Sequence, residues 1–249
     1  MHRLIRLIGF AGATLALALA PAIAGDFTHS TLTPGEQSVP GTYDITAVTI
    51  TQNVSATITA GASVSCNNGA PNFNHTANSY WRRFDLNGAH GITGCFTASQ
   101  VDFGIEEAVG GGASQPVSVR LYTIPNASPL NTANLTLIGS VGLNVPSQSL
   151  TIFSALVAGV VIDASLLDLV VEVFTPSGQT VGDRFFIGSN SLGQTAPSYL
   201  SAAECGVLQP TNTAALGFPG MHVYMAVTGG ECPTPTIAKT WGSLKTIYR

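Results

Sequence analysis

Charged side chains are scarce in this sequence. Asp, Glu, Lys and Arg make up 9% of the 249 residues, and the formal net charge is −4 at pH 7. Binding to nucleic acid requires a basic face, so this composition argues against a nucleic-acid partner. The chain does not read as disordered, because 45% of its residues are hydrophobic and disordered chains are poor in them. Its polarity comes from Thr, Ser, Asn and Gly, which suit β-strands joined by turns.

Long apolar runs are missing as well, except at the N-terminus. There, two arginines precede an apolar run over residues 7–20, Pro21 interrupts it, and small residues end at Ala24. This is the layout of a secretory signal peptide with cleavage after Ala24. A membrane anchor is the alternative, but the run is shorter than the roughly 20 residues that span a bilayer. We therefore expect residues 1–24 to be removed, and a secreted protein with no transmembrane segment after cleavage.

The spacing of the four cysteines excludes the common zinc motifs. The chain contains no C-x-x-C and no histidine at metal-ligand spacing from a cysteine. An even number of cysteines in an exported chain predicts two disulfides. Three connectivities are open, and we favour Cys66–Cys205 with Cys95–Cys232.

The body of the chain lacks an apolar period of 3.6 and alternates with a period of two instead. Segments such as "SYWRRFDL", "QVDFGIE", "PVSVRLYTI" and "MHVYMAV" alternate over four to eight residues, and Gly, Pro or Asn interrupts nearly every gap between them. The most apolar stretch, "SALVAGVVIDASLLDLVVEVF", reads as strand–turn–strand rather than a buried helix. We predict an all-β fold over residues 25–231, an antiparallel two-sheet sandwich that is jelly-roll-like, with an immunoglobulin-like sandwich as the alternative.

Several of these segments together carry a family resemblance. "NSYWRRFDL", "QVDFGIEEA", "LVVEVFTP" and "FFIGSNSLGQTAPSYLSAAECG" occur in this order. They resemble an uncharacterised β-sandwich domain of secreted bacterial proteins, which is found alone or attached to exported proteases and surface proteins. The resemblance covers residues 65–229. It implies export and a jelly-roll-like fold, and it implies no catalytic motif.

The serine-rich loop between Arg184 and Gly206 is a candidate catalytic segment. An α/β-hydrolase nucleophile would lie in a G-x-S-x-G turn between a strand and a helix, and this loop has none. A triad is defined by geometry, so a partner such as His222 stays open. We favour a structural loop, because Ser, Thr and Asn side chains hydrogen-bond to a turning backbone.

Acidic residues gather near the end of one predicted strand, at Asp102, Glu106 and Glu107. A glycosidase needs two facing carboxylates, and a structural calcium ion needs several oxygen ligands. The simpler interpretation, which we favour, is a solvated strand end or ion pairs with Arg82 and Arg83. We expect no cofactor other than such a calcium ion.

Two aromatic residues, Trp81 and Tyr122, alternate away from apolar neighbours, and we take them as candidate binding residues on an exposed face. They favour carbohydrate binding by analogy with other sandwiches, although Trp81 could instead cover the edge of the sandwich. We predict a secreted, non-catalytic binding, adhesion or structural surface module whose partner is a polysaccharide or cell-surface component. A secreted hydrolase is the alternative.

The C-terminal segment, residues 232–249, differs in character from the rest. "PTPT" predicts an extended spacer, and the apolar residues that follow recur at helical spacing. The segment is also basic, and its candidate functional residues are Trp241, Lys245, Tyr248 and Arg249. Either this tail is an address recognised by a partner or a membrane surface, or it packs on the sandwich.

Overall fold

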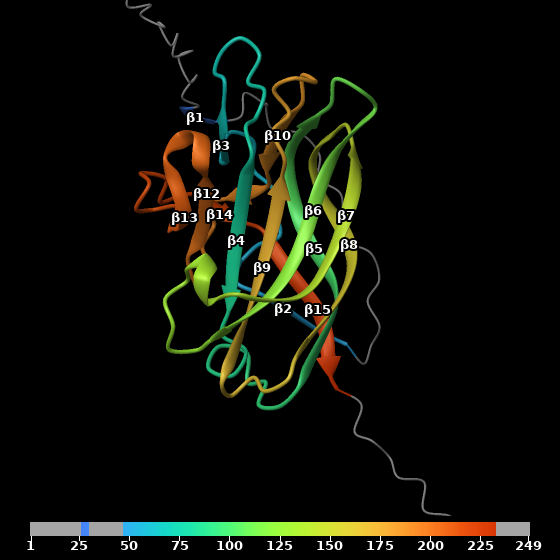
Figure 1. Ribbon diagram of the computed structural model, residues 1–249, viewed down its shortest axis with the longest axis vertical. Coiled ribbons are helices and arrows are strands. Elements are labelled where there is room, and N and C mark those ends of the chain that lie inside the picture. Colours follow the sequence, from blue (N-terminus) through green and yellow to red (C-terminus); the bar gives the residue numbers. More distant parts are fainter. Residues whose placement is uncertain (1–25, 30–46, 233–249) are drawn as a thin grey trace, which may run out of the picture.

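The computed structural model of the protein describes residues 26–29 and 47–232 (Figure 1). The predicted signal peptide, the C-terminal segment after Cys232 and the tail candidates Trp241, Lys245, Tyr248 and Arg249 lie outside these residues. In the described part, no helix has the length and apolar character needed to cross a membrane.

Two antiparallel sheets pack face to face (Figure 1). The six-stranded sheet, here the β4 sheet, has the order β13 (Val207–Asn212), β12 (Ser198–Ala202), β4 (Asn78–Phe84), β9 (Leu167–Thr175), β6 (Ser114–Pro125), β7 (Thr136–Pro146). The five-stranded sheet, here the β5 sheet, has the order β10 (Arg184–Ile187), β5 (Phe96–Val109), β15 (Met225–Glu231), β2 (Val48–Thr51), with β8 (Gln148–Val161) also paired to β5. Two small ladders pair β1 (Asp26–His29) with β3 (Val64–Asn67), and β11 (Ser189–Asn190) with β14 (His222–Val223). Short 3₁₀ turns form at η1 (Thr132–Asn134) and η2 (Ala203–Cys205).

The strand pairing is nested. β6 pairs with β7, β5 with β8, and β4 with β9. The chain from β4 to β9 is therefore a long double strand that folds over from one sheet to the other, which is a jelly-roll-like arrangement. The predicted all-β antiparallel sandwich is confirmed, and so is the predicted strand–turn–strand, because β8 ends at Val161 and β9 begins at Leu167.

The core fills the space between the two sheets. Alternate residues of the facing strands point inward, and they form one continuous apolar cluster that includes Tyr80, Phe84, Val101, Phe103, Ile105, Val119, Leu121, Val171, Val173 and Phe185. Because strands bury every second side chain, the period-two pattern in the sequence marks this inner face directly.

Two disulfides fasten the sandwich. Cys66 in β3 is bonded to Cys205 in η2, and Cys95 before β5 is bonded to Cys232 after β15. This is the pairing favoured above. The bonded residues are 139 and 137 positions apart, so the chain-entropy model assigns about 4–5 kcal/mol of stabilisation to each bond.

A buried arginine organises the segment between β11 and β12. Arg82 is fully buried, and its Nη1 donates to Gln194 Oε1 and to the Ala196 carbonyl, both at 2.8 Å. Its Nη2 donates to Asn53 Oδ1 at 3.0 Å, and its Nε donates to the Val223 carbonyl at 2.8 Å. One side chain therefore holds the loop, β14 and the segment after β2 together, which supports the structural interpretation of this loop.

Candidate functional site

Trp81 is not an exposed aromatic residue, and that prediction is wrong. Its side chain does lie on the outer face of the β4 sheet, but the residue is 4% exposed. Leu130 and Leu135, in the connection between β6 and β7, pack over the cluster that contains it. The indole Nε1 donates to Ser201 Oγ at 3.0 Å. The alternating pattern correctly predicts that the Trp81 side chain points to the outer face. The connection between β6 and β7 covers that face, so Trp81 is not exposed.

Tyr122 packs beside Trp81, with 5.9 Å between the ring centroids. Its hydroxyl donates to Glu172 Oε2 at 2.7 Å. Glu172 is buried, and it also accepts from Ser79 Oγ at 2.6 Å and from Arg120 Nη1 at 3.1 Å. Burial, followed by the contact with Glu172, raises the pKa of Tyr122. The Tyr122 hydroxyl thus serves an internal network.

The three carboxylates Asp102, Glu106 and Glu107 do not form one site. Asp102 Oδ1 accepts from Gln100 Nε2 and Ser154 Oγ, and Glu107 Oε1 pairs with Arg184 Nη2 at 3.1 Å. Across residues 26–29 and 47–232, no group of three His, Cys, Asp or Glu side chains is placed to hold a metal ion. Each carboxylate is held by a different neighbour, so the geometry does not support the calcium site.

The favoured interpretation, a solvated strand end or ion pairs with Arg82 and Arg83, is wrong as well. The three carboxylates are buried, and the two arginines bind other groups. Arg82 donates to amide and backbone carbonyl oxygens. Arg83 pairs with Asp168 on the adjacent strand, with Nε 2.7 Å from Oδ2. Register explains the difference: Arg83 lies opposite Val170 in β9, diagonal to Asp168 on the same face.

Three of the loop serines, Ser189, Ser198 and Ser201, hydrogen-bond to other side chains. Ser198 Oγ donates to Gln194 Oε1 at 2.9 Å. His222 Nδ1 accepts from the Gly193 N–H at 3.1 Å, and burial lowers the pKa of His222. Ser191 is exposed and borders a cavity. The described contacts therefore support a loop fastened by its own polar side chains.

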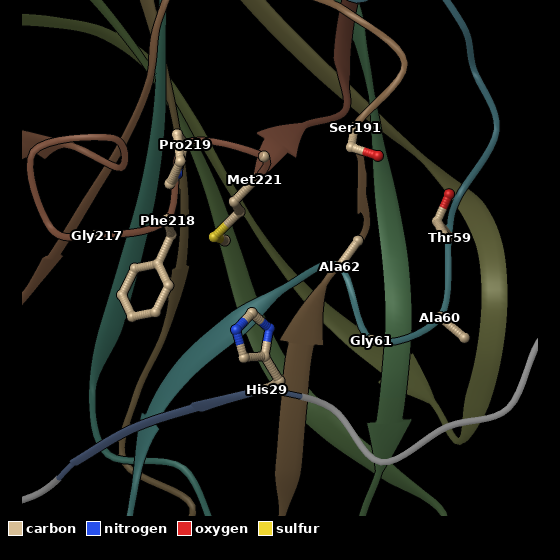
Figure 2. Close-up of a pocket in the computed structure, with 11 residues that line it drawn as sticks. His29, Thr59, Ala60, Gly61, Ala62, Ser191, Gly217, Phe218, Pro219 and Met221 are labelled. Carbon is tan, nitrogen blue, oxygen red and sulfur yellow. The ribbon is translucent and has the colours of Figure 1, made fainter.

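That cavity is the strongest candidate site. It has a volume of about 370 Å³, within the range of small-ligand pockets. Three parts of the chain surround it: His29 of β1, residues 59–62, and residues 217–221, with Ser191 at the rim. In Figure 2 the His29 ring stands between the Phe218 ring and the 59–62 segment, and the hydroxyls of Thr59 and Ser191 lie at the opposite end.

One wall of this pocket is fixed by a buried carboxylate. Glu106 of β5 is 0% exposed, and its two oxygens accept from the Gly61 N–H at 2.6 Å and from the Ser63 N–H at 2.9 Å. Gly61 has φ of +74°, a conformation that glycine adopts without strain. The Thr59 N–H donates to the Ser189 carbonyl at 2.9 Å. The wall is therefore rigid, although it has no regular secondary structure.

The opposite wall is aromatic. Phe218 lies in the loop between β13 and β14, and its ring meets those of His29 and Phe27 edge-on, at centroid distances of 5.7 and 6.0 Å. The Phe218 N–H donates to the Thr213 carbonyl at 2.9 Å, and the Phe218 carbonyl accepts from the Met221 N–H at 3.1 Å. The Phe218 ring is therefore held in place before any ligand arrives.

Comparisons with known proteins give structural similarity but no sequence relative. No family model and no curated protein matches the chain. A crystal structure of the cysteine protease and lectin-like domains of Cwp84, a surface-layer-associated protein of Clostridium difficile, is similar with a TM-score of 0.44 and 8% sequence identity. The alignment covers 77% of this chain and 37% of the Cwp84 chain, so it spans well under half of that structure. The resemblance to the secreted bacterial family stays a prediction.

Sequence reasoning missed the pocket because its residues come from loops. Phe218 stands in "GFPG", an aromatic residue between glycines and a proline, which is the one local signal of an aromatic side chain held at a turn. His29 reaches the site because β1 pairs with β3. That pairing joins segments more than thirty residues apart, and no local pattern encodes it.

Proposed function

We propose that this protein is a secreted, non-catalytic β-sandwich module that binds carbohydrate in the pocket between His29, Phe218 and residues 59–62. The observation that carries the proposal is the composition of the lining. A fixed aromatic ring faces hydroxyl and backbone groups, and the described residues that line the pocket include no Asp, Glu, Lys or Arg.

A sugar matches this lining chemically. A pyranose ring has a face of C–H groups, which packs on an aromatic ring, and a rim of hydroxyls, which both donate and accept hydrogen bonds. The Phe218 ring supplies the apolar contact, and Thr59 and Ser191 supply hydroxyls. The described lining offers no carboxylate to a cation and no Lys or Arg to an anion, which supports a neutral glycan as the ligand.

The absence of a catalytic role is part of the proposal. Glycoside hydrolysis needs two facing carboxylates at the substrate. The described lining contains no carboxylate, and the Glu106 carboxylate next to the 59–63 segment is buried and accepts from backbone N–H groups. The chemistry of the lining supports holding a ligand, and no specific observation favours the hydrolase.

Export is supported by covalent structure. All four cysteines are paired in two long-range disulfides, which persist in oxidising compartments. Together with the predicted signal peptide, the disulfides support the proposal that the module acts outside the cytoplasm, where polysaccharides and cell-surface components are its candidate partners.

The test is a binding panel with a blocked pocket. A Cβ at Gly220 would lie 3.6 Å from the Ser191 Cβ, an ordinary contact, so Gly220→Val narrows the mouth without a clash at that atom. Retention on cellulose, chitin or peptidoglycan should fall by at least about tenfold, equivalent to about 1.4 kcal/mol. Leu156→Ala, at an exposed site on β8, is the control. Folded wild-type protein that binds none of the three, or a Gly220→Val variant that binds normally, would refute the proposal.

A further inference from the structure

A second hollow lies on the outer face of the β4 sheet, away from the pocket. It has a volume of about 180 Å³, and its lining includes Ser79, Phe174, Ser201 and Ala203. No residue lines both this hollow and the pocket. This volume equals that of about six water molecules in the liquid, so it suits a single sugar-sized ring rather than an oligosaccharide chain.

The floor of the hollow is a row of three side chains across three strands. Ser79 of β4 lies directly opposite Phe174 of β9 on one side and Ser201 of β12 on the other. Side chains directly opposite each other on one face have Cβ atoms about 5 Å apart. Two hydroxyls at this spacing, next to an aromatic ring, match two neighbouring hydroxyls of a sugar ring.

The two hydroxyls are set to opposite roles by buried partners. Ser79 Oγ donates its hydrogen to Glu172 Oε1 at 2.6 Å, so it is left to accept from a ligand. Ser201 Oγ accepts from the indole N–H of Trp81 at 3.0 Å, so its own hydrogen is left to donate. Glu172 is 2% exposed, and it therefore polarises Ser79 without presenting a charge to the ligand.

The aromatic side of the hollow is also fixed. The Arg120 guanidinium stacks over the Phe174 ring, 4.5 Å from its centroid. Arg120 comes from β6, whereas Ser79 comes from β4, and these strands flank β9 on opposite sides. The Phe174 ring is thus supported from the β6 side and borders the hollow on the β4 side.

We propose that this hollow is a second carbohydrate site, which binds one neutral sugar ring through a pair of neighbouring hydroxyls and the Phe174 ring. One sugar hydroxyl donates to Ser79, the other accepts from Ser201, and the C–H face packs on Phe174. The inference rests on the proposed function for its ligand class only; its residues and its contacts are separate.

The test is amide NMR titration of the full chain with N-acetylglucosamine, methyl α-glucopyranoside and methyl α-mannopyranoside. We expect shift changes at Ser79, Phe174 and Ser201 with at least one of these sugars, at millimolar affinity. Ala203→Leu, an exposed alanine at the hollow in η2, should weaken this response by at least about tenfold. Ala133→Leu, an exposed alanine in the 3₁₀ turn η1, is the matched control.

The outcomes separate the two proposals. Loss of the hollow's response in Ala203→Leu but not in Gly220→Val supports the second site, whatever happens at the pocket. Loss of all binding in Gly220→Val, with an unchanged response in Ala203→Leu, overturns the second site and keeps the first. Folded protein with no shift at Ser79 or Ser201 for any of the three sugars overturns the second site outright.

Discussion

The outer faces of the two sheets are both covered by irregular segments, and each cover is fastened by one ionisable side chain. On the β5 sheet, the Glu106 carboxylate accepts from the N–H groups of Gly61 and Ser63. On the β4 sheet, the Arg83 guanidinium donates to the carbonyls of Asn126 and Ser128, at 2.6 and 2.7 Å. Glu106 thus binds backbone N–H donors, whereas Arg83 binds backbone carbonyl acceptors.

The two covers have different consequences. The 59–62 segment and His29 of β1 line a pocket between them. In the connection between β6 and β7, Leu130 and Leu135 pack against the cluster that contains Trp81, and Trp81 is buried. A turn that aims its N–H groups inward can be held by an acid, and one that aims its carbonyls inward can be held by a base. The charge of the buried side chain therefore depends on whether the turn directs its N–H groups or its carbonyl groups inward.

The largest effect is expected from breaking the acidic fastening. Glu106→Gln replaces one accepting oxygen by an NH₂ group that faces a backbone N–H, so one buried donor loses its partner. We expect a loss of about 3 kcal/mol in the free energy of unfolding and weaker glycan binding at the pocket. Urea denaturation and the binding panel measure these two quantities.

Glu107→Gln is the matched control for this change, because Glu107 is the next residue and pairs with Arg184 rather than with the 59–63 segment. If Glu106→Gln and Glu107→Gln changed pocket binding equally, the role of Glu106 in holding the pocket wall would be wrong.

Breaking the basic fastening should cost less. Arg83→Met removes the bonds to Asn126 and Ser128 and leaves Asp168 without its ion pair, but the Arg83 side chain is 19% exposed, so water can replace part of the loss. We expect about 2 kcal/mol of destabilisation and a red shift of tryptophan fluorescence as the cover over Trp81 loosens. Unchanged fluorescence with a lowered stability would contradict this role of Arg83.

The fate of Trp81 shows how far the sequence predicts the molecule. Alternation in "SYWRRFDL" placed Tyr80, Arg82 and Phe84 on the inner face, and they are inner residues. It also placed Trp81 on the outer face, correctly. Whether an outer residue meets water depends on a segment more than forty residues away in the sequence, and period-two alternation holds no information about that segment.

The pocket was beyond sequence reasoning for a related reason. Strands have a periodicity that can be detected in one sequence, whereas loop walls depend on individual long-range bonds such as those of Glu106 to Gly61 and Ser63. The sequence does show that Asp102, Glu106 and Glu107 gather near one strand end. The interpretation of this cluster as a calcium site found no support, because each carboxylate is used by a different segment.

A third fastening differs from these two because it relies on a histidine. His75 is buried, with Nδ1 2.8 Å from the Thr76 carbonyl and Nε2 3.2 Å from Gln115 Oε1. Burial lowers the pKa of His75. The unfolded chain, with a histidine pKa of about 6.5, therefore binds the proton first as the pH falls.

Stability should accordingly be fully present above that value and decrease as the pH falls through the window below it. We expect His75 to account for a loss of about 1 kcal/mol between pH 7 and 5.5. Burial also lowers the pKa of His90 and His222, which act with the same sign. The measurement is therefore the difference in slope between wild type and His75→Gln in urea denaturation at several pH values. Equal slopes would exclude a contribution from His75.

The smallest effect is expected from Tyr122, whose hydroxyl belongs to the hydrogen-bond network of Glu172 rather than to the Leu130 and Leu135 cover. Tyr122→Phe keeps the ring that packs on Trp81 and removes only the bond from the hydroxyl to Glu172. Glu172 keeps Ser79 and Arg120 as donors, so the loss should be about 1 kcal/mol or less in the free energy of unfolding, with unchanged tryptophan fluorescence. The same stability loss with a red shift would mean that the hydroxyl, and not the Leu130 and Leu135 cover, keeps water from Trp81. Tyr122→Phe tests the hydrogen bonds to Glu172, and Arg83→Met tests the connection that covers Trp81. Together the two variants separate these contributions on the outer face of the β4 sheet.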